Sequence, residues 1–190
     1  MADSPAFTHH PSVADFAVPK HGYLAIRPSA SFGYIATSTL VVETGLATSG
    51  DPRVLLLQRA ASDVMPNKWE PPGGACDDDD PSILAGAARE LLEEAGLEAL
   101  HIAGQVGAPY FFTVEDGKRV CQFNFAVRVR TNNEDTAAIW PPVKLNPEEH
   151  QRFLWATKSE VEANRAGDID LDFTREEVRQ TVLQAFDHHK

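Results

Sequence analysis

The feature that most constrains the fold is the stretch 81–95, where apolar side chains recur at helical spacing. Placed at about 100° per residue, these side chains share one face. They are Ile83, Leu84, Ala87, Ala88, Leu91 and Ala95. Asp80 is expected to act as the N-cap, Pro81 as the first helical residue, and Gly96 as the C-terminal stop. The spacing therefore predicts an amphipathic helix that packs against a core.

Strand-like runs on both sides of this helix predict a mixed α/β (α+β) domain. They combine β-branched and aromatic residues with period-two alternation, and Asp116-Gly117 predicts a hairpin turn between two of them. The expected strands are 31–43, 53–59, 110–114, 120–129 and 152–156. Because helices and strands mix without a regular βαβ repeat, a small mixed-sheet sandwich is favoured.

Two capping boxes predict helices near the C-terminus. Thr157 with Glu160 would open a helix that closes near Gly167, and Thr174 with Glu177 would open a final helix with its apolar residues inward. Residues 1–31 carry four prolines and are expected to form an extension packed on the domain, which spans 32–190.

Composition excludes several classes of protein. The 190 residues carry 17 Lys and Arg against 28 Asp and Glu, a net charge of −11, which disfavours binding to nucleic acids or anionic membranes. With 43% hydrophobic residues the chain can bury a core. No apolar run is long enough to span a bilayer, and the first residues lack the layout of a secretory signal. Two cysteines cannot form a disulfide scaffold, so a cytoplasmic protein is expected.

Three carboxylates lie along one edge of the predicted helix. Glu90, Glu93 and Glu94 repel one another at this spacing and oppose the helix dipole near its C-terminal end. A divalent cation would reverse both penalties, since clustered carboxylate oxygens are the ligands that Mg²⁺ takes. The alternative is an ordinary solvated face. Gly86 on the same edge indicates a close approach, by a ligand or by a packed neighbour.

These residues carry a family resemblance. The run Arg89-Glu90-Leu91-Leu92-Glu93-Glu94-Ala95-Gly96-Leu97, preceded by Trp69-Glu70-Pro71-Pro72-Gly73-Gly74, resembles the Nudix box and the loop that leads into it. The resemblance extends from Phe32 to about Ala163. It implies an α/β/α sandwich with a mixed sheet, and hydrolysis of a diphosphate linked to another moiety, with Mg²⁺ or Mn²⁺ as cofactor.

The first half of the box departs from the family pattern. Where the family has a glutamate this chain has Pro81, and where it has a glycine the chain has Ala75. Gly74 and Asp80 each stand one step further out. A shift of one residue would restore both positions, with aspartate in place of glutamate, which leaves the role of Asp80 open.

The resemblance also implies roles for individual residues. Glu93 and Glu94 would bind metal, and Glu90 would be a further ligand or the base that deprotonates water. Arg89 would orient a glutamate through a bidentate contact. Gly73 and Gly74 would let backbone amides approach the phosphates. A late acidic residue is expected as another ligand or base, with Glu149 preferred to its neighbour Glu148, and a plain solvated turn is the alternative for this segment.

Substrate contacts are expected from cations and aromatic rings near the glycine loop. Arg59 could supplement the metal, and Trp69 and Phe111 could stack on a base or line an apolar pocket. Each of these residues has a plain structural alternative, as a solvated cation or a core aromatic. Lys68, Lys118, Arg128 and Arg130 are further candidate cations, and Tyr110, Phe112 and Phe123 are further candidate aromatics.

The expected function is metal-dependent hydrolysis of a small-molecule diphosphate, with no nucleic acid or membrane partner, by a monomer or homodimer. A nucleoside di- or triphosphate, a nucleotide sugar, a dinucleotide and an isoprenoid diphosphate all stay open as substrates. The main alternative is a catalytically silent ligand-binding or regulatory module on the same fold. Isoprenoid diphosphate isomerisation is disfavoured, because Cys76 is poorly placed for it.

Overall fold

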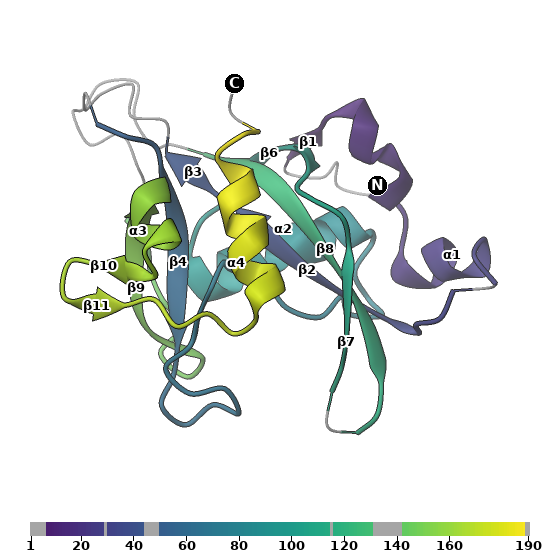
Figure 1. The fold of residues 1–190 in the computed structure, drawn as a ribbon. Coiled ribbons are helices and arrows are strands. Elements are labelled where there is room, and N and C mark those ends of the chain that lie inside the picture. The colour runs from purple at the N-terminus through teal and green to yellow at the C-terminus, as the bar shows by residue number, and fades with distance from the viewer. Residues whose placement is uncertain (1–6, 29, 44–49, 115, 131–141, 189–190) are drawn as a thin grey trace.

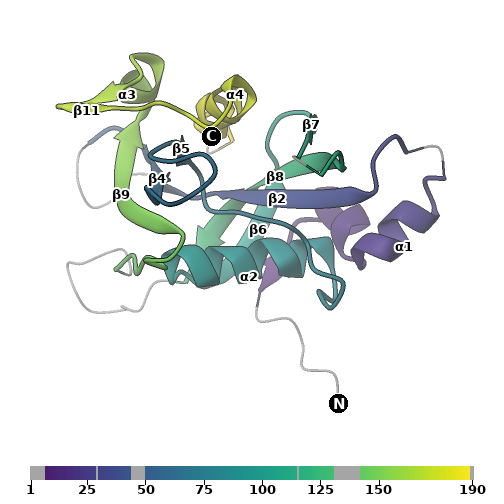
Figure 2. The same cartoon turned by 90° about the horizontal axis from the view of Figure 1, so that it is seen from below.

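Two β-sheets form the middle of the molecule, and helices cover both outer faces (Figures 1 and 2). This computed structural model describes residues 7–28, 30–43, 50–114, 116–130 and 142–188. Helix α2 (Ile83–Ala95) lies on one side of the sheets, and α3 (Lys158–Glu162) and α4 (Glu176–Ala185) lie on the other. The expected α/β/α sandwich is confirmed.

The larger sheet is mixed, as expected, and β8 is its centre. Its strands are β1 (Thr8–His9), β2 (Tyr34–Leu40), β6 (Ala99–Gln105), β7 (Tyr110–Thr113) and β8 (Arg119–Val129). Strand β2 runs parallel to β8, whereas β6 and β7 are antiparallel to it. The alternate residues of β8 from Cys121 to Val129 enter the core beneath α2, as their period of two predicts.

The second sheet is built on β4 (Arg53–Arg59), which matches the predicted strand in both bounds. Its neighbours are β3 (Val42–Glu43), β5 (Trp69–Glu70) and β9 (His150–Thr157). Residues 54–57 are fully buried, which is the expected result for an unbroken apolar run covered on both faces.

Helix α2 begins two residues later than predicted. Its N-cap is Ser82, whose hydroxyl accepts from the Ala85 N–H at 3.0 Å, so Asp80 is not the cap and Pro81 precedes the helix. The cause is a stronger partner for Asp80, described below. Gly96 ends the helix in the left-handed conformation, as expected. The apolar face packs mainly against β2 and β6.

The two C-terminal helices differ from expectation at one boundary each. The Thr157–Glu160 capping box is present, but α3 ends well before Gly167 because Asn164 takes a positive φ of 52°. The hairpin of β10 (Arg165–Ala166) and β11 (Ile169–Asp170) follows. Before α4 the second box is absent, since the N-cap is Arg175, without a side-chain cap bond.

The N-terminal segment holds more regular structure than its prolines suggest. It contains β1, the 3₁₀ helix Pro11–Phe16 and helix α1 (Lys20–Ala25), because Pro11 and Pro19 stand at helix starts, where proline fits. Val13, Phe16 and Tyr23 join the core beneath the larger sheet. Among the described residues, no helix is both long and apolar enough to cross a membrane.

Candidate active site

The glycine loop, residues 71–75 after β5, runs along the edge of β2 like an added strand. The Thr39 N–H donates to the Pro72 carbonyl and the Thr37 N–H donates to the Gly74 carbonyl, each at 2.8 Å. Because successive backbone groups point to opposite sides of an extended chain, the N–H of Gly73 faces away from β2. It faces helix α2 instead.

Glu94 receives that N–H and is buried. Its Oε2 lies 2.7 Å from the Gly73 nitrogen, and the residue is only 5% exposed. Burial raises the pKa of Glu94 well above its usual value. The hydrogen bond from Gly73 acts in the opposite direction, whereas the charges of nearby carboxylates raise the pKa further. Those carboxylates belong to Glu70, Glu90 and Glu149. Arg59 pairs with Glu70 and Arg89 pairs with Glu90, but among the described residues no arginine or lysine pairs with Glu94. A bound metal ion would supply the positive charge that Glu94 lacks.

Glu90 is held against Gly74. A Cβ on Gly74 would lie 2.7 Å from the Glu90 carboxyl carbon, so only glycine allows this approach. Burial raises the pKa of Glu90, although contacts with Arg89 act in the opposite direction. The loop and the helix are thus in direct contact at two consecutive glycines.

The acidic cluster of this site consists of Glu90, Glu93 and Glu94 on α2 and of Glu149 in the loop before β9. Arg89 organises two of these side chains. Its Nε and Nη2 each donate to one oxygen of Asp80 at 3.0 Å, so the bidentate contact that was expected on a glutamate is made with this aspartate. Its Nη1 donates to Glu90 and to Glu93 at 2.9 Å each. Arg89 therefore fixes two of the three predicted metal ligands.

Asp80 is a buried partner of Arg89. It is 7% exposed. Burial alone would raise its pKa, but the hydrogen bonds from Arg89 and from the Asp77 N–H, together with the charges of Arg89 and Lys20, lower it. Gly86 leaves room for this carboxylate, since a Cβ there would lie 2.6 Å from Asp80 Oδ2. Of the two explanations for Gly86, close packing by a neighbour is confirmed.

The late loop, residues 142–149 before β9, reaches the acidic cluster by donating hydrogen bonds to backbone carbonyls at the end of α2. The Lys144 N–H donates to the Ala95 carbonyl at 2.9 Å, and the Asn146 N–H donates to the Glu94 carbonyl at 3.3 Å. Asn146 also donates through its side chain to Glu149 Oε1 at 2.9 Å. These bonds bring Glu149 to Glu94. One donor atom each of Glu94, Glu149 and His150 lie within 4.8 Å of one another.

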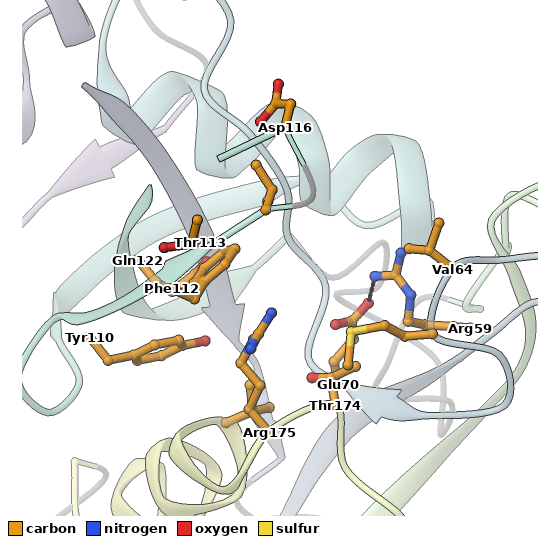
Figure 3. Close-up of a pocket in the computed structure, with 13 residues that line it drawn as sticks. Arg59, Val64, Glu70, Tyr110, Phe112, Thr113, Asp116, Gln122, Thr174 and Arg175 are labelled. Atoms are coloured by element: carbon orange, nitrogen blue, oxygen red, sulfur yellow. Dashed lines mark hydrogen bonds and ion pairs between the residues drawn. The ribbon is translucent and has the colours of Figure 1, made fainter. Parts of the chain in front are cut away.

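A cavity of about 540 Å³ opens between β7, the start of α4 and the second sheet (Figure 3). Tyr110 and Phe112 form its aromatic wall, and the Arg175 guanidinium lies 4.5 Å from the centre of the Phe112 ring. Figure 3 shows Arg175 between this wall and the ion pair of Arg59 with Glu70. A planar or anionic group therefore fits this cavity.

A small polar hollow joins the cavity to the glycine loop. It shares Glu70, Tyr110 and Gln122 with the cavity and is also lined by Gly73. Two of its buried polar atoms, Thr37 Oγ1 and Asn124 Nδ2, have no hydrogen-bond partner within the described part of the chain. Gly73, which bonds to Glu94, thus connects the acidic cluster to this hollow, which in turn adjoins the cavity.

Of the predicted substrate contacts Arg59, Trp69 and Phe111, the first lines the cavity and the other two do not. Arg59 lines the cavity, where Asp63 and Glu70 hold it. Trp69 does not, because its side chain is fully buried and donates to the Asp170 carbonyl at 3.1 Å. Phe111 points to the opposite side of β7 from its two aromatic neighbours and packs against Phe32, with ring centroids 5.5 Å apart.

The structure also changes what was expected of the Gly73 amide and of the candidate cations. The Gly73 N–H donates to Glu94, a predicted metal ligand, so this group is not free to contact phosphate. Lys68 pairs with Asp172 and Lys118 with Asp116, both at 2.6 Å. Burial, with the charge of Asp80 adding to it, raises the pKa of Cys76 to about 12, which fits its expected structural role.

Sequence reasoning missed three side chains of this region. Glu70 stands in the loop that resembles the family pattern, but nothing in its spacing indicates a pair with Arg59. Arg175 stands at a predicted helix start and carries no motif of its own. His150 follows Glu149 without an expected role, and its position directly after two acidic residues is the available signal.

Comparisons with known proteins fit this geometry. The family model of the NUDIX domain matches residues 41–176. A Bos taurus protein, m7GpppN-mRNA hydrolase NUDT17, is 43% identical over 61 residues, which cover 30% of this chain and 20% of the relative. The chain thus spans about a fifth of that relative's length.

Solved structures show the same fold. A MutT protein from Methanosarcina mazei Go1 has a TM-score of 0.58 at 22% identity, covering 83% of this chain and 96% of that one. The NUDIX domain of Shewanella oneidensis NrtR, complexed with ADP ribose, has a TM-score of 0.60 at 17% identity and covers 90% of this chain and 98% of that one. Since the family match spans most of the chain, the protein belongs to the Nudix family.

Proposed function

We propose that this protein is a metal-dependent pyrophosphohydrolase that cleaves a diphosphate bond in nucleoside diphosphate-linked substrates. The observation that carries the proposal is the bond between Gly73 and Glu94. It places the acidic cluster directly behind the small polar hollow, which adjoins a cavity large enough for a nucleoside.

The donor set fits a hard divalent cation. Glu90, Glu93, Glu94 and Glu149 would hold Mg²⁺ or Mn²⁺ through carboxylate oxygens. When bound, such an ion neutralises charge on the diphosphate oxygens and lowers the pKa of a water ligand.

The chain's own residues orient the reacting groups. Arg89 holds Glu90 and Glu93 in place, and Asp80 holds Arg89. Glu90 or Glu149 would take the proton of the attacking water, because both face the cluster. The Arg175 guanidinium and the rings of Tyr110 and Phe112 would position the group beyond the diphosphate.

The cavity and the relatives narrow the range of candidate substrates. A nucleobase would stack on the aromatic wall, and the unpartnered Thr37 and Asn124 atoms would take polar contacts from it. The name of the bovine relative brings capped dinucleotides into consideration, and the ADP ribose complex brings nucleotide sugars. The net charge of −11 favours a small substrate over a long RNA.

The test is turnover of a substrate panel with Mg²⁺ or Mn²⁺. The panel contains ADP-ribose, a nucleoside triphosphate, a diadenosine polyphosphate, a UDP-sugar, a methylated cap dinucleotide and an isoprenoid diphosphate. We expect phosphorus NMR to show cleavage between two phosphorus atoms of at least one nucleotide, and not of the isoprenoid compound. Glu93→Gln and Glu94→Gln should abolish it.

The matched control is Glu98→Gln, which changes an exposed acid that pairs with Arg130 just beyond α2. It should leave turnover unchanged. If no panel member is cleaved but nucleotides still bind, in wild type and in the Glu93 and Glu94 variants alike, the silent binding module is the correct interpretation.

A further inference from the structure

His150 is a buried side chain whose ring atoms lack hydrogen bonds. It is 2% exposed, and within the described residues neither Nδ1 nor Nε2 has a hydrogen-bond partner. Buried polar atoms are almost always paired, because leaving one unpaired forfeits its hydration without replacing it. An orphaned imidazole beside an acidic cluster therefore needs an explanation.

The backbone fixes where this ring lies. The His150 N–H donates to the Asn146 carbonyl at 2.9 Å, and His150 pairs with Arg59 at a β-bulge where β9 meets β4. One ring nitrogen consequently lies within 4.8 Å of carboxylate oxygens of both Glu94 and Glu149. The ring faces the acidic cluster without belonging to the helix that supplies most of it.

Glu70 is the alternative partner of the ring. Its Oε1 lies 3.8 Å from His150 Nε2, which is too long for a hydrogen bond. The same oxygen already accepts from Arg59. The contact with Glu70 therefore leaves His150 free to serve another group.

The spacing suits one shared metal ion. Imidazole nitrogens and carboxylate oxygens bind transition ions at about 2.0–2.2 Å, so neighbouring donors of one ion lie roughly 3–4 Å apart. The donor atoms of Glu94, Glu149 and His150 lie within 4.8 Å of one another, close enough for one ion to draw them into that range. Imidazole is a common ligand of divalent transition ions, whereas Mg²⁺ takes oxygen ligands almost exclusively.

We propose that His150 is a nitrogen ligand of a metal site with Glu94 and Glu149, and that this site favours a divalent transition-metal ion over Mg²⁺. The inference rests on the proposed function only in taking the Glu94 cluster as a metal site. It adds a ligand and a metal preference that the carboxylates of the Nudix box do not supply.

Pulsed EPR of the Mn²⁺-loaded full-length protein tests the ligand. We expect coupling from ¹⁴N on the wild type, replaced by ¹⁵N coupling when the histidines alone are ¹⁵N-labelled. His150→Gln should abolish this coupling. His101→Gln is the matched control, since His101 is paired with Thr8 at 2.7 Å on β6, and it should keep the coupling.

Calorimetry tests the preference. His150→Gln should weaken Co²⁺ binding by on the order of tenfold or more, while Mg²⁺ affinity changes by less than about twofold. Mn²⁺ binding without histidine coupling in the folded wild type, or coupling that persists in His150→Gln, overturns the ligand assignment. Turnover with Mg²⁺ would then still support the proposed function, whereas failure of the wild type to bind any divalent ion overturns both.

Discussion

Arg89 donates hydrogen bonds to both carboxylate oxygens of Asp80, through Nε and Nη2, at 3.0 Å each. The same guanidinium continues to Glu90 and Glu93 with its remaining nitrogen. Asp80 stands one step outside the spacing of the Nudix box, yet its carboxylate supports the arginine that orders two acids of the site. An apparent departure in sequence is thus a positioning contact in the fold.

Replacing Asp80 by Asn should destabilise the protein. Arg89 would lose a charged, buried partner, and we expect the free energy of unfolding at pH 7 to fall by about 1–3 kcal/mol. Urea denaturation measures this change. Asp79→Asn, an exposed neighbour, is the control and should have little effect.

The same contact gives a pH dependence with a definite sign. The pKa of Asp80 is lower in the folded state than in the unfolded chain, so its stabilisation is present above about pH 4 and is lost as pH falls through the folded-state value. Unfolding measured from pH 3 to 7 should show a smaller acid-side loss in Asp80→Asn than in wild type. Parallel curves for the two proteins would contradict the pairing.

Two glycines in helices should respond oppositely to alanine. Gly86→Ala places a Cβ 2.6 Å from Asp80 Oδ2, and overpacking of this kind costs typically about 1–3 kcal/mol. A Cβ added to Gly22 in α1 would meet no atom within 4 Å, so Gly22→Ala should stabilise by roughly 0.5–1 kcal/mol. Thermal unfolding of both variants checks this, and a stabilised Gly86→Ala would show that Asp80 lies elsewhere.

Glu94→Gln should be more stable than wild type when no metal is present. Burial and neighbouring acids raise the pKa of Glu94, so its ionised form opposes folding at pH 7, and removing the charge should increase the free energy of unfolding. Mn²⁺ should raise the melting temperature of wild type and of Glu98→Gln, but not that of Glu94→Gln. A destabilised variant that keeps its response to metal would contradict this account of the cluster.

Arg175 should affect substrate affinity more than chemistry. It lines the cavity over the Phe112 ring, and within the described residues no hydrogen bond or ion pair joins it to the acidic cluster. Arg175→Gln should therefore raise KM by on the order of tenfold with kcat changed by less than about twofold. Steady-state kinetics with the best panel substrate measure both values. Arg165→Gln in the exposed β10–β11 hairpin is the control. A loss confined to kcat would place Arg175 at the reacting atoms instead.

Strong local patterns predicted most of the fold. The buried run of β4, the apolar face of α2 and the β7–β8 hairpin all follow from periodicity and turn chemistry. Strand β6 was missed because alanine and glycine dilute its alternation. The cap of α2 was misassigned because Arg89, nine residues away, binds Asp80 more strongly than a helix end does.

The candidate site was predictable only in part. One helix carries Glu90, Glu93 and Glu94, so their spacing was sufficient to bring them together. Arg175 and Glu70 reach the cavity from segments about a hundred residues apart, through sheet pairing and helix packing that no local pattern encodes. The position of Glu149 depended on backbone bonds from the late loop to the end of α2.

The most direct test of the central claim is phosphorus NMR of the nucleotide panel with purified wild type, in the presence of Mg²⁺ or Mn²⁺ and again after chelation. The account predicts that one P–O–P bond of a nucleoside diphosphate-linked compound is cleaved only when metal is present, and that Glu94→Gln leaves it intact. Cleavage that persists in the chelated protein or in Glu94→Gln would contradict the account.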